Sequence, residues 1–307
     1  SKLARSPGFL SCVTALEFGV RADAAEVYVP RAAAAARDED AVEPQSESVY
    51  VPSAPENAAP VLSAPDKAAT LTINNDTDYD VDVAACLASG THIRAEGDGP
   101  QVLVFHTHAS ESYTPDAAFP YTPTETERTT DTRYNVVRVG DELCTALEKR
   151  GIETLHLRSL FDTPTYAGSY DRSLAAIEQA LEENPSVKVV IDLHRDSILT
   201  DEGEAYKTSC TVDGAETAQL MFVVGTDAGG LYHPDWRDNL NFVSTLQYAL
   251  NRAYPSLMRP VNLRTQRFGQ HASPGSLLVE VGSSGNTLPE ALSAVRLFAD
   301  VLADEMT

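Results

Sequence analysis

The stretch VLVFHTHASESY, Val102 to Tyr113, sets the expected fold and the expected site. Its first four residues, Val102–Phe105, are an apolar run of the length typical of a short buried strand. Ionisable side chains follow at once, at His106, His108 and Glu111. Open α/β sheets build their sites at the carboxyl ends of buried strands, so we expect a functional site here.

The spacing of His108 and Glu111 points to a metal. In a turn or a first helical turn, residues three apart can direct an imidazole and a carboxylate at one point. Zinc accepts this pair of ligands and needs one more histidine and a water for catalysis. Each residue alone also has a simpler interpretation: His108 as a surface histidine, and Glu111 as a carboxylate favoured by a helix dipole.

Composition excludes some classes of protein. A net charge of −22 over 307 residues argues against nucleic acid and anionic membrane surfaces as partners. The four cysteines, Cys12, Cys86, Cys144 and Cys210, form no CxxC pair, so a zinc knuckle is not expected. Free buried thiols are favoured, and disulfides are left open.

No apolar run reaches the length of a membrane helix. Because the chain begins at Ser1, we expect any natural signal or anchor to have been removed.

The chain divides into a linker and a working domain. Residues 1–68 mix an alanine run with charged residues and prolines, which predicts a flexible, disordered linker or stalk. Residues 69–307 form the expected catalytic domain. Within it, the alternation in 69–100 predicts a small β-hairpin before an α/β core at 101–307.

Strand patterns alternate with helix patterns throughout the core. This order predicts a three-layer α/β/α fold with a central, mostly parallel sheet. The polar stretch 112–133 is expected to be a long loop over the site. The expected strands are 102–105, 153–157, 187–194, 205–212, 221–225, 261–264 and 277–281, and the expected helices are 135–149, 171–184, 238–253 and 289–305.

Three of these strands end in ionisable groups. The first leads into His108 and Glu111, the next ends on His194, and another carries Glu280. Parallel strands deliver their carboxyl ends to one edge, so we expect all four side chains to meet. His194 alone is more often a core residue, but a carboxylate inside an apolar strand costs several kcal/mol unless paired or near a metal. Two imidazoles, one ligand carboxylate and one free carboxylate are what a zinc hydrolase needs.

Other polar residues nearby receive supporting roles. His106 is expected to support a ligand or face the substrate, with the third zinc ligand as its alternative role. Arg195 and Asp196 are expected to orient His194 or to bind substrate, with a surface ion pair as the alternative. His271 and Asn286 are candidate substrate contacts, although helix capping suffices for most of the turn around Asn286.

Four motifs together resemble the stage II sporulation protein P (SpoIIP) family, over about Ala69 to Thr307. They are FHTHASESY, YNVVRVGDEL, IDLHRD and SPGSLLVEVGSSGNTLPEAL. That family is related to the zinc-dependent N-acetylmuramoyl-L-alanine amidases. The resemblance implies Zn²⁺ held by His108, Glu111 and His194, with Glu280 as the catalytic carboxylate.

The resemblance also implies a setting. Members of the family are anchored by an N-terminal membrane segment and act outside the cytoplasm on peptidoglycan glycan strands and stem peptides. They act as amidases, and endopeptidase action is also attributed to them, during engulfment in spore formation. Their partners are the transglycosylase SpoIID and the membrane protein SpoIIM.

Two features depart from the related amidases and from the family. Those amidases carry a ligand glutamate at the start of the helix after the first histidine, but Thr132–Asn135 contains none, which moves the expected ligand to Glu111. His271 stands where an acidic residue is expected.

Two other functions fit the same residues. A zinc carboxypeptidase also uses HxxE with a distant histidine and glutamate; it needs an arginine to clamp the substrate carboxylate, and Arg195 or Arg264 could serve. A catalytically inactive wall-binding scaffold predicts no zinc and no effect of Glu280→Gln.

Overall fold

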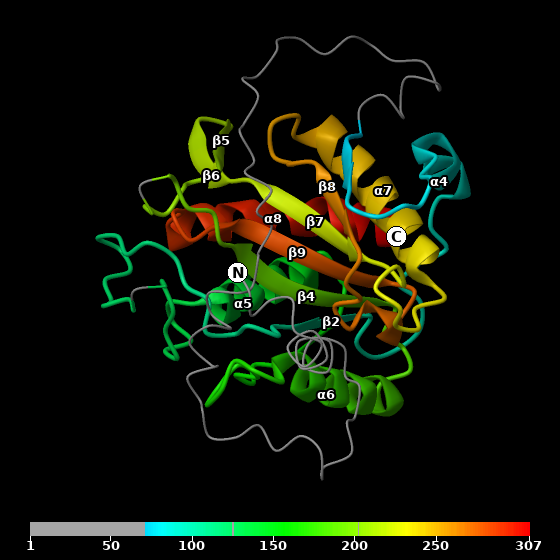
Figure 1. Ribbon diagram of the computed structural model, residues 1–307, viewed down its shortest axis with the longest axis horizontal. Helices are drawn as coiled ribbons and strands as arrows, with labels where there is room; N and C mark the ends of the chain where they lie inside the picture. The colour runs from blue at the N-terminus through cyan, green and yellow to red at the C-terminus, as the bar shows by residue number, and fades with distance from the viewer. Residues whose placement is uncertain (1–70, 125, 202) are drawn as a thin grey trace, which may run out of the picture.

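The computed structural model describes residues 71–124, 126–201 and 203–307, drawn in colour in Figure 1. The expected linker at 1–68 lies outside these residues. A seven-stranded sheet of order β1-β8-β7-β9-β4-β2-β3 forms the middle layer. Its strands are β1 (Ile73–Asn75), β2 (Val102–Phe105), β3 (Thr154–His156), β4 (Val189–Asp196), β7 (Leu220–Gly225), β8 (Val261–Arg264) and β9 (Ser276–Ser283). A separate hairpin joins β5 (Ser209–Val212) and β6 (Ala215–Ala218).

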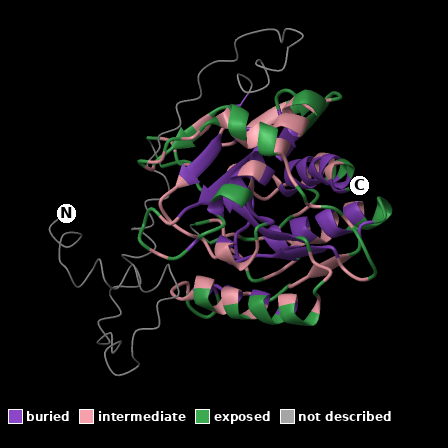
Figure 2. Ribbon diagram, turned by 90° about the vertical axis from the view of Figure 1, so that its right-hand side faces the viewer, coloured by how far each residue is buried: buried purple, intermediate pink, exposed green. Residues whose placement is uncertain are grey.

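Helices cover both faces of the large sheet (Figures 1 and 2). On one face α6 (Ser169–Glu183) buries Ile177 and Ala180 against Leu103, Phe105 and Val190. The other face carries α5 (Val136–Lys149), α7 (Trp236–Ala253) and α8 (Leu288–Met306), which share the larger core with the strands. The expected three-layer α/β/α fold is confirmed.

The sheet consists of two parallel blocks of opposite sense. β9, β4, β2 and β3 run parallel to one another, as do β1, β8 and β7, while β7 and β9 pair antiparallel. The expected, mostly parallel sheet is confirmed. The carboxyl ends of β2, β4 and β9 therefore meet at one edge, while β7 and β8 end at the opposite edge.

Alternation along β4 decides which side chains reach which face. All eight residues of β4 are buried. Ile191 and Leu193 belong to the core on the α5, α7 and α8 side, and Val190 packs on the α6 side. Successive side chains of a strand point to opposite faces, so Asp192 and His194 lie on the α6 face with Val190.

The prediction of a β-hairpin at 69–100 is wrong. β1 pairs in parallel with β8 inside the main sheet, and the second run forms helix α4 (Val83–Ser89). The Asp82 carboxylate caps this helix by accepting a hydrogen bond from Ala85 N at 3.0 Å. Alanines dominate that run, and their helix propensity outweighs its short apolar alternation.

The cysteines and the helix lengths can also be compared with the expectations from the sequence. Among the described cysteines, Cys86, Cys144 and Cys210 are free thiols, and Cys144 is buried; Cys12 lies outside this part of the chain. Within residues 71–124, 126–201 and 203–307, no helix is both long enough and apolar enough to cross a membrane.

Candidate functional site

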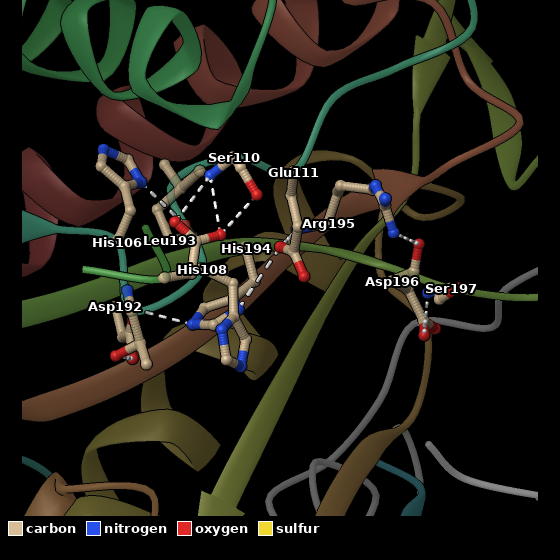
Figure 3. Close-up of polar contacts among 12 residues, drawn as sticks. His106, His108, Ser110, Glu111, Asp192, Leu193, His194, Arg195, Asp196 and Ser197 are labelled. Carbon is tan, nitrogen blue, oxygen red and sulfur yellow. Dashed lines mark hydrogen bonds and ion pairs between the residues drawn. The ribbon is translucent and has the colours of Figure 1, made fainter. Parts of the chain in front are cut away.

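Three of the four expected side chains, His108, Glu111 and His194, lie together at the shared edge of β2, β4 and β9 (Figure 3). His194 and Glu280 are register partners on β4 and β9. His108 and Glu111 stand in the turn after β2, where Glu111 N donates to His108 O at 3.1 Å. This turn folds the imidazole and the carboxylate back over the end of β4.

His194 lies between two carboxylates. Its Nδ1 is 3.5 Å from Glu111 Oε2, and its Nε2 is 2.8 Å from Asp192 Oδ1. Burial alone lowers the pKa of His194, but the negative charges of Asp192 and Glu111 outweigh it and raise the pKa well above its usual value. The two carboxylates therefore favour a proton on His194, although Nε2 makes no well-directed hydrogen bond to a described residue, and the nitrogen that binds a metal would have to lose its proton.

His108 is a neutral imidazole beside it. The rings of His108 and His194 meet edge to face with centroids 5.2 Å apart. Tyr166 stacks on His108 at 4.3 Å, with its hydroxyl 2.8 Å from His108 Nε2, and Ser169 Oγ lies 3.4 Å from Nδ1. Burial holds the pKa of His108 well below its usual value, which leaves a lone pair for a ligand.

Glu111 is a buried, ionised carboxylate. Its Oε2 accepts from Arg195 N at 3.2 Å, and its Oε1 lies 3.6 Å from Arg128 Nη2. Burial alone raises the pKa of Glu111, but the hydrogen bond and charge of His194, with the charges of Arg195 and Arg128, hold it well below its usual value.

Glu280 is the least compensated carboxyl group of the site. Its side chain keeps some exposed surface, yet Oε2 is buried and has no hydrogen-bond partner among the described residues. Burial, reinforced by the charge of Asp196, raises the pKa of Glu280 well above its usual value. Asp196 is itself paired with Arg259 at 2.7 Å. Glu280 is therefore a protonated or readily protonated group at the edge of the site.

His106 lies away from this cluster, with both of its ring nitrogens engaged. Nδ1 is 2.8 Å from Leu193 O and Nε2 is 2.8 Å from His156 Nε2. A side chain on Gly140 of α5 would meet both imidazoles at 2.7 Å, which places the pair against α5. This geometry favours a bracing role behind β2 and β4 over a third ligand.

Arg195 holds the loop that follows Glu111. Its guanidinium is buried and donates to three loop carbonyls, Ser112 O at 2.8 Å, Thr126 O at 3.0 Å and Glu127 O at 3.1 Å. These bonds fix the loop beside the site and leave Arg195 little freedom to clamp a substrate.

Asn286 and His271 lie where a substrate contact is hard to make. Asn286 is fully buried and bonds to Thr208, Ser283 N and Glu290 Oε2. His271, in the short helix η2 (Gln270–Ala272), precedes β9 and therefore lies at the opposite edge from Glu280.

Three residues of the site were not expected from the sequence: Asp192, Arg128 and Tyr166. Asp192 carried a usable signal, because it lies two residues before His194 and strand residues two apart share a face. Arg128 and Tyr166 reach the site from loops, and no spacing in the sequence links them to His108.

The side chains of His108, Glu111 and His194 are of the types that bind zinc, but they are not oriented toward one shared point. In the part of the chain that the structure describes, no three His, Cys, Asp or Glu side chains are arranged to hold a metal ion. His108, Glu111 and His194 nevertheless lie together, and two imidazoles with one carboxylate are a donor set that catalytic zinc uses. His194 Nδ1 faces Glu111 Oε2 and His108 Nε2 faces the Tyr166 hydroxyl, so these side chains would have to turn to hold a shared ion.

Comparison with known sequences identifies the family. The profile of "Stage II sporulation protein P (SpoIIP)" matches residues 24–303. The chain belongs to this family. Stage II sporulation protein P of Bacillus subtilis (strain 168) is 29% identical over 219 residues, which are 68% of this chain and 51% of that protein. The chain thus spans about half the length of the curated SpoIIP relative that it matches.

Solved structures show a more distant likeness. N-acetylmuramoyl-L-alanine amidase AmiC2 of Nostoc punctiforme matches with a TM-score of 0.35 and 13% identity, covering 68% of this chain and 97% of that one. The amidase Ami1 of Mycobacterium smegmatis matches with a TM-score of 0.39 and 14% identity, covering 69% and 96%. The assignment of the SpoIIP chain to the α/β class rests on its own strand order and layers.

Proposed function

We propose that this chain is a peptidoglycan hydrolase, a zinc-dependent N-acetylmuramoyl-L-alanine amidase of sporulation and engulfment. It would cleave the amide between the lactyl group of the glycan and the stem peptide. One observation carries the proposal: His108, Glu111 and His194 lie together at a sheet edge, and the carboxyl group of Glu280 lies beside them with one oxygen unpartnered. Membership of the SpoIIP family supports it.

In this proposal His108, Glu111 and His194 hold the zinc ion and Glu280 moves protons. Zinc, when bound, lowers the pKa of a water molecule and polarises the scissile carbonyl. Ionised Glu280, a form that the charge of a nearby zinc ion would favour, would accept the proton of the attacking water and return it to the leaving nitrogen. Its partly exposed position suits contact with a substrate, and its raised pKa suits donation of the proton.

The contacts of two arginines favour an amidase over a carboxypeptidase. Arg195 is occupied by carbonyl groups of the loop. Arg264 pairs with Asp76 at 2.9 Å, at the carboxyl end of β8 and so at the edge away from Glu280. Neither is placed to clamp a free C-terminal carboxylate beside the proposed zinc.

The proposed setting follows from the family. We infer an extracytoplasmic, wall-facing protein, anchored through an N-terminal segment and acting with a SpoIID-like transglycosylase and a SpoIIM-like membrane protein. Glycan strands and stem peptides are its proposed substrates.

Mass spectrometry of the products released from purified peptidoglycan tests the proposed activity. Zinc-loaded protein should release free stem peptides and leave peptide-free glycan, and a chelator or His194→Ala should abolish both products. Shortened peptides still linked to glycan would instead show endopeptidase action, and removal of C-terminal residues alone would show a carboxypeptidase. The absence of products in every sample would favour the scaffold.

A further inference from the structure

Asp192 is a buried carboxylate in the middle of an apolar strand. Its exposed fraction is 2%, and the residues on either side of it in β4 are Ile191 and Leu193. A charge in this position is costly unless its oxygens are paired. Alternation along the strand places Asp192 on the same face as His194, two residues later.

Both oxygens of Asp192 are paired. Oδ1 lies 2.8 Å from His194 Nε2, an ion-pair contact without well-directed hydrogen-bond geometry, and accepts a hydrogen bond from Thr107 N at 2.8 Å. Oδ2 accepts from Thr107 Oγ1 at 2.7 Å, and that hydroxyl is 2.9 Å from Ser173 Oγ on α6. The carboxylate is therefore fixed from the turn after β2 as well as from its own strand.

This contact decides which nitrogen of His194 is available. Because Nε2 faces Asp192, Nδ1 is the nitrogen that faces Glu111 Oε2, at 3.5 Å. Histidines that bind metals commonly donate their other N–H to a carboxylate, which fixes the tautomer and the ring orientation.

We propose that Asp192, held by Thr107, is a positioning residue that fixes His194 with its Nδ1 toward the zinc ion. The inference rests on the proposed zinc function. Asp192 was not among the site residues expected from the sequence. Asp192 itself would touch neither metal nor substrate, and it acts through His194.

The test measures zinc affinity of the whole 307-residue chain by competition with a chromophoric chelator. Asp192→Asn keeps the size of the side chain but removes its charge and one acceptor. The expected result is a dissociation constant for zinc raised about 10- to 100-fold. Glu290→Gln is the matched control, because Glu290, on α8, is also buried, at 6% exposure, but pairs with Lys207 and Asn286 away from His194. It should alter stability and leave zinc affinity unchanged.

A second measurement determines which ring nitrogen of His194 carries the proton. Imidazole nitrogen NMR of the zinc-loaded protein should show the His194 proton on Nε2. If Asp192→Asn fails to fold, Thr107→Val removes the hydroxyl that contacts Oδ2 and Ser173 Oγ, keeps the Thr107 N–H bond to Oδ1, and should weaken zinc binding by a few-fold.

The results distinguish a failure of the proposed role of Asp192 from a failure of the proposed zinc function. If the unaltered chain binds zinc tightly and Asp192→Asn or Thr107→Val binds it equally well, or if the His194 proton lies on Nδ1, the role of Asp192 is overturned and the zinc function stands. If the unaltered chain binds no zinc at all, the proposed zinc function fails and this inference fails with it.

Discussion

Glu280 lies beside His194, because the two residues are register partners on adjacent parallel strands, β9 and β4. A charged imidazole and a carboxyl group of raised pKa thus occupy neighbouring positions at one sheet edge. Their environments differ: His194 is paired with two carboxylates, and Glu280 Oε2 has no partner among the described residues. This difference suits Glu280 to move protons, whereas His194 could hold a metal only after losing the proton from the nitrogen that faces the ion.

Replacing Glu280 with glutamine should abolish activity without harming the fold. The exchange removes the proton-transfer group, which contributes about 10²- to 10⁴-fold in rate. Because the folded state raises the pKa of Glu280, the ionised form destabilises folding above the usual pKa, so the neutral amide should leave the melting temperature at pH 7 unchanged or higher. Hydrolysis rates and thermal melts check both points, and hydrolysis as fast as that of the unaltered chain would show that Glu280 is not the proton-transfer group.

Replacing Gly140 with alanine should destabilise the protein. The added methyl group would lie 2.7 Å from the Nε2 atoms of both His106 and His156. Overpacking of this kind costs about 1–3 kcal/mol, measured as the free energy of unfolding in urea. Thr145→Ala on the exposed side of the same helix is the control and should change little. Equal stability of the two variants would show that the histidine pair gives way easily.

Replacing Arg195 with lysine should loosen the loop after Glu111. A lysine cannot reproduce the fork that reaches Ser112, Thr126 and Glu127, and buried groups left unpaired cost about 1–3 kcal/mol. Limited proteolysis should cut the loop faster. Arg133→Ala, which removes an exposed pair with Asp131, should leave the cutting rate unchanged, and equal rates in the two variants would contradict the anchor. Slower cutting with glycan fragments would indicate that the loop contacts substrate.

Acid should destabilise the fold partly through His233. Burial, with the charges of His271 and Arg267, lowers the pKa of His233 to about 4. The unfolded chain takes up the proton more readily, so the stabilising effect is complete above about pH 6.5 and is lost as the pH falls toward 4. Thermal melts across this window should fall less steeply for His233→Leu than for the unaltered chain. Parallel curves would contradict the lowered pKa.

The sequence predicted the convergence of the site because the signal is local. Val102–Phe105 is an apolar run and Leu277–Val281 is apolar apart from Glu280, and parallel packing brings their carboxyl ends together whatever the details of the loops. The same reasoning could not find the reversal at β7. That strand runs the other way because the β5–β6 hairpin returns the chain to the edge where β4 ended.

Within the site, a residue could be predicted from the sequence only where it lies in a regular strand or helix. Asp192 follows from the period of a strand, whereas Tyr166 and Arg128 approach His108 and Glu111 from loops that no periodicity describes. The supporting roles expected of Asn286 and His271 came from their order in the chain, which does not show that one is enclosed by hydrogen bonds and the other lies at the far edge.

The most direct test of the proposed zinc site is a crystal structure grown with zinc and recorded at the zinc absorption edge. We expect one strong anomalous peak bound by His108, Glu111 and His194, with Nδ1 as the ligand atom of His194 and Glu280 beside the ion. A site without a peak would contradict it, as would zinc bound instead by His233 and His271, whose rings lie 6.3 Å apart at the other edge of the sheet.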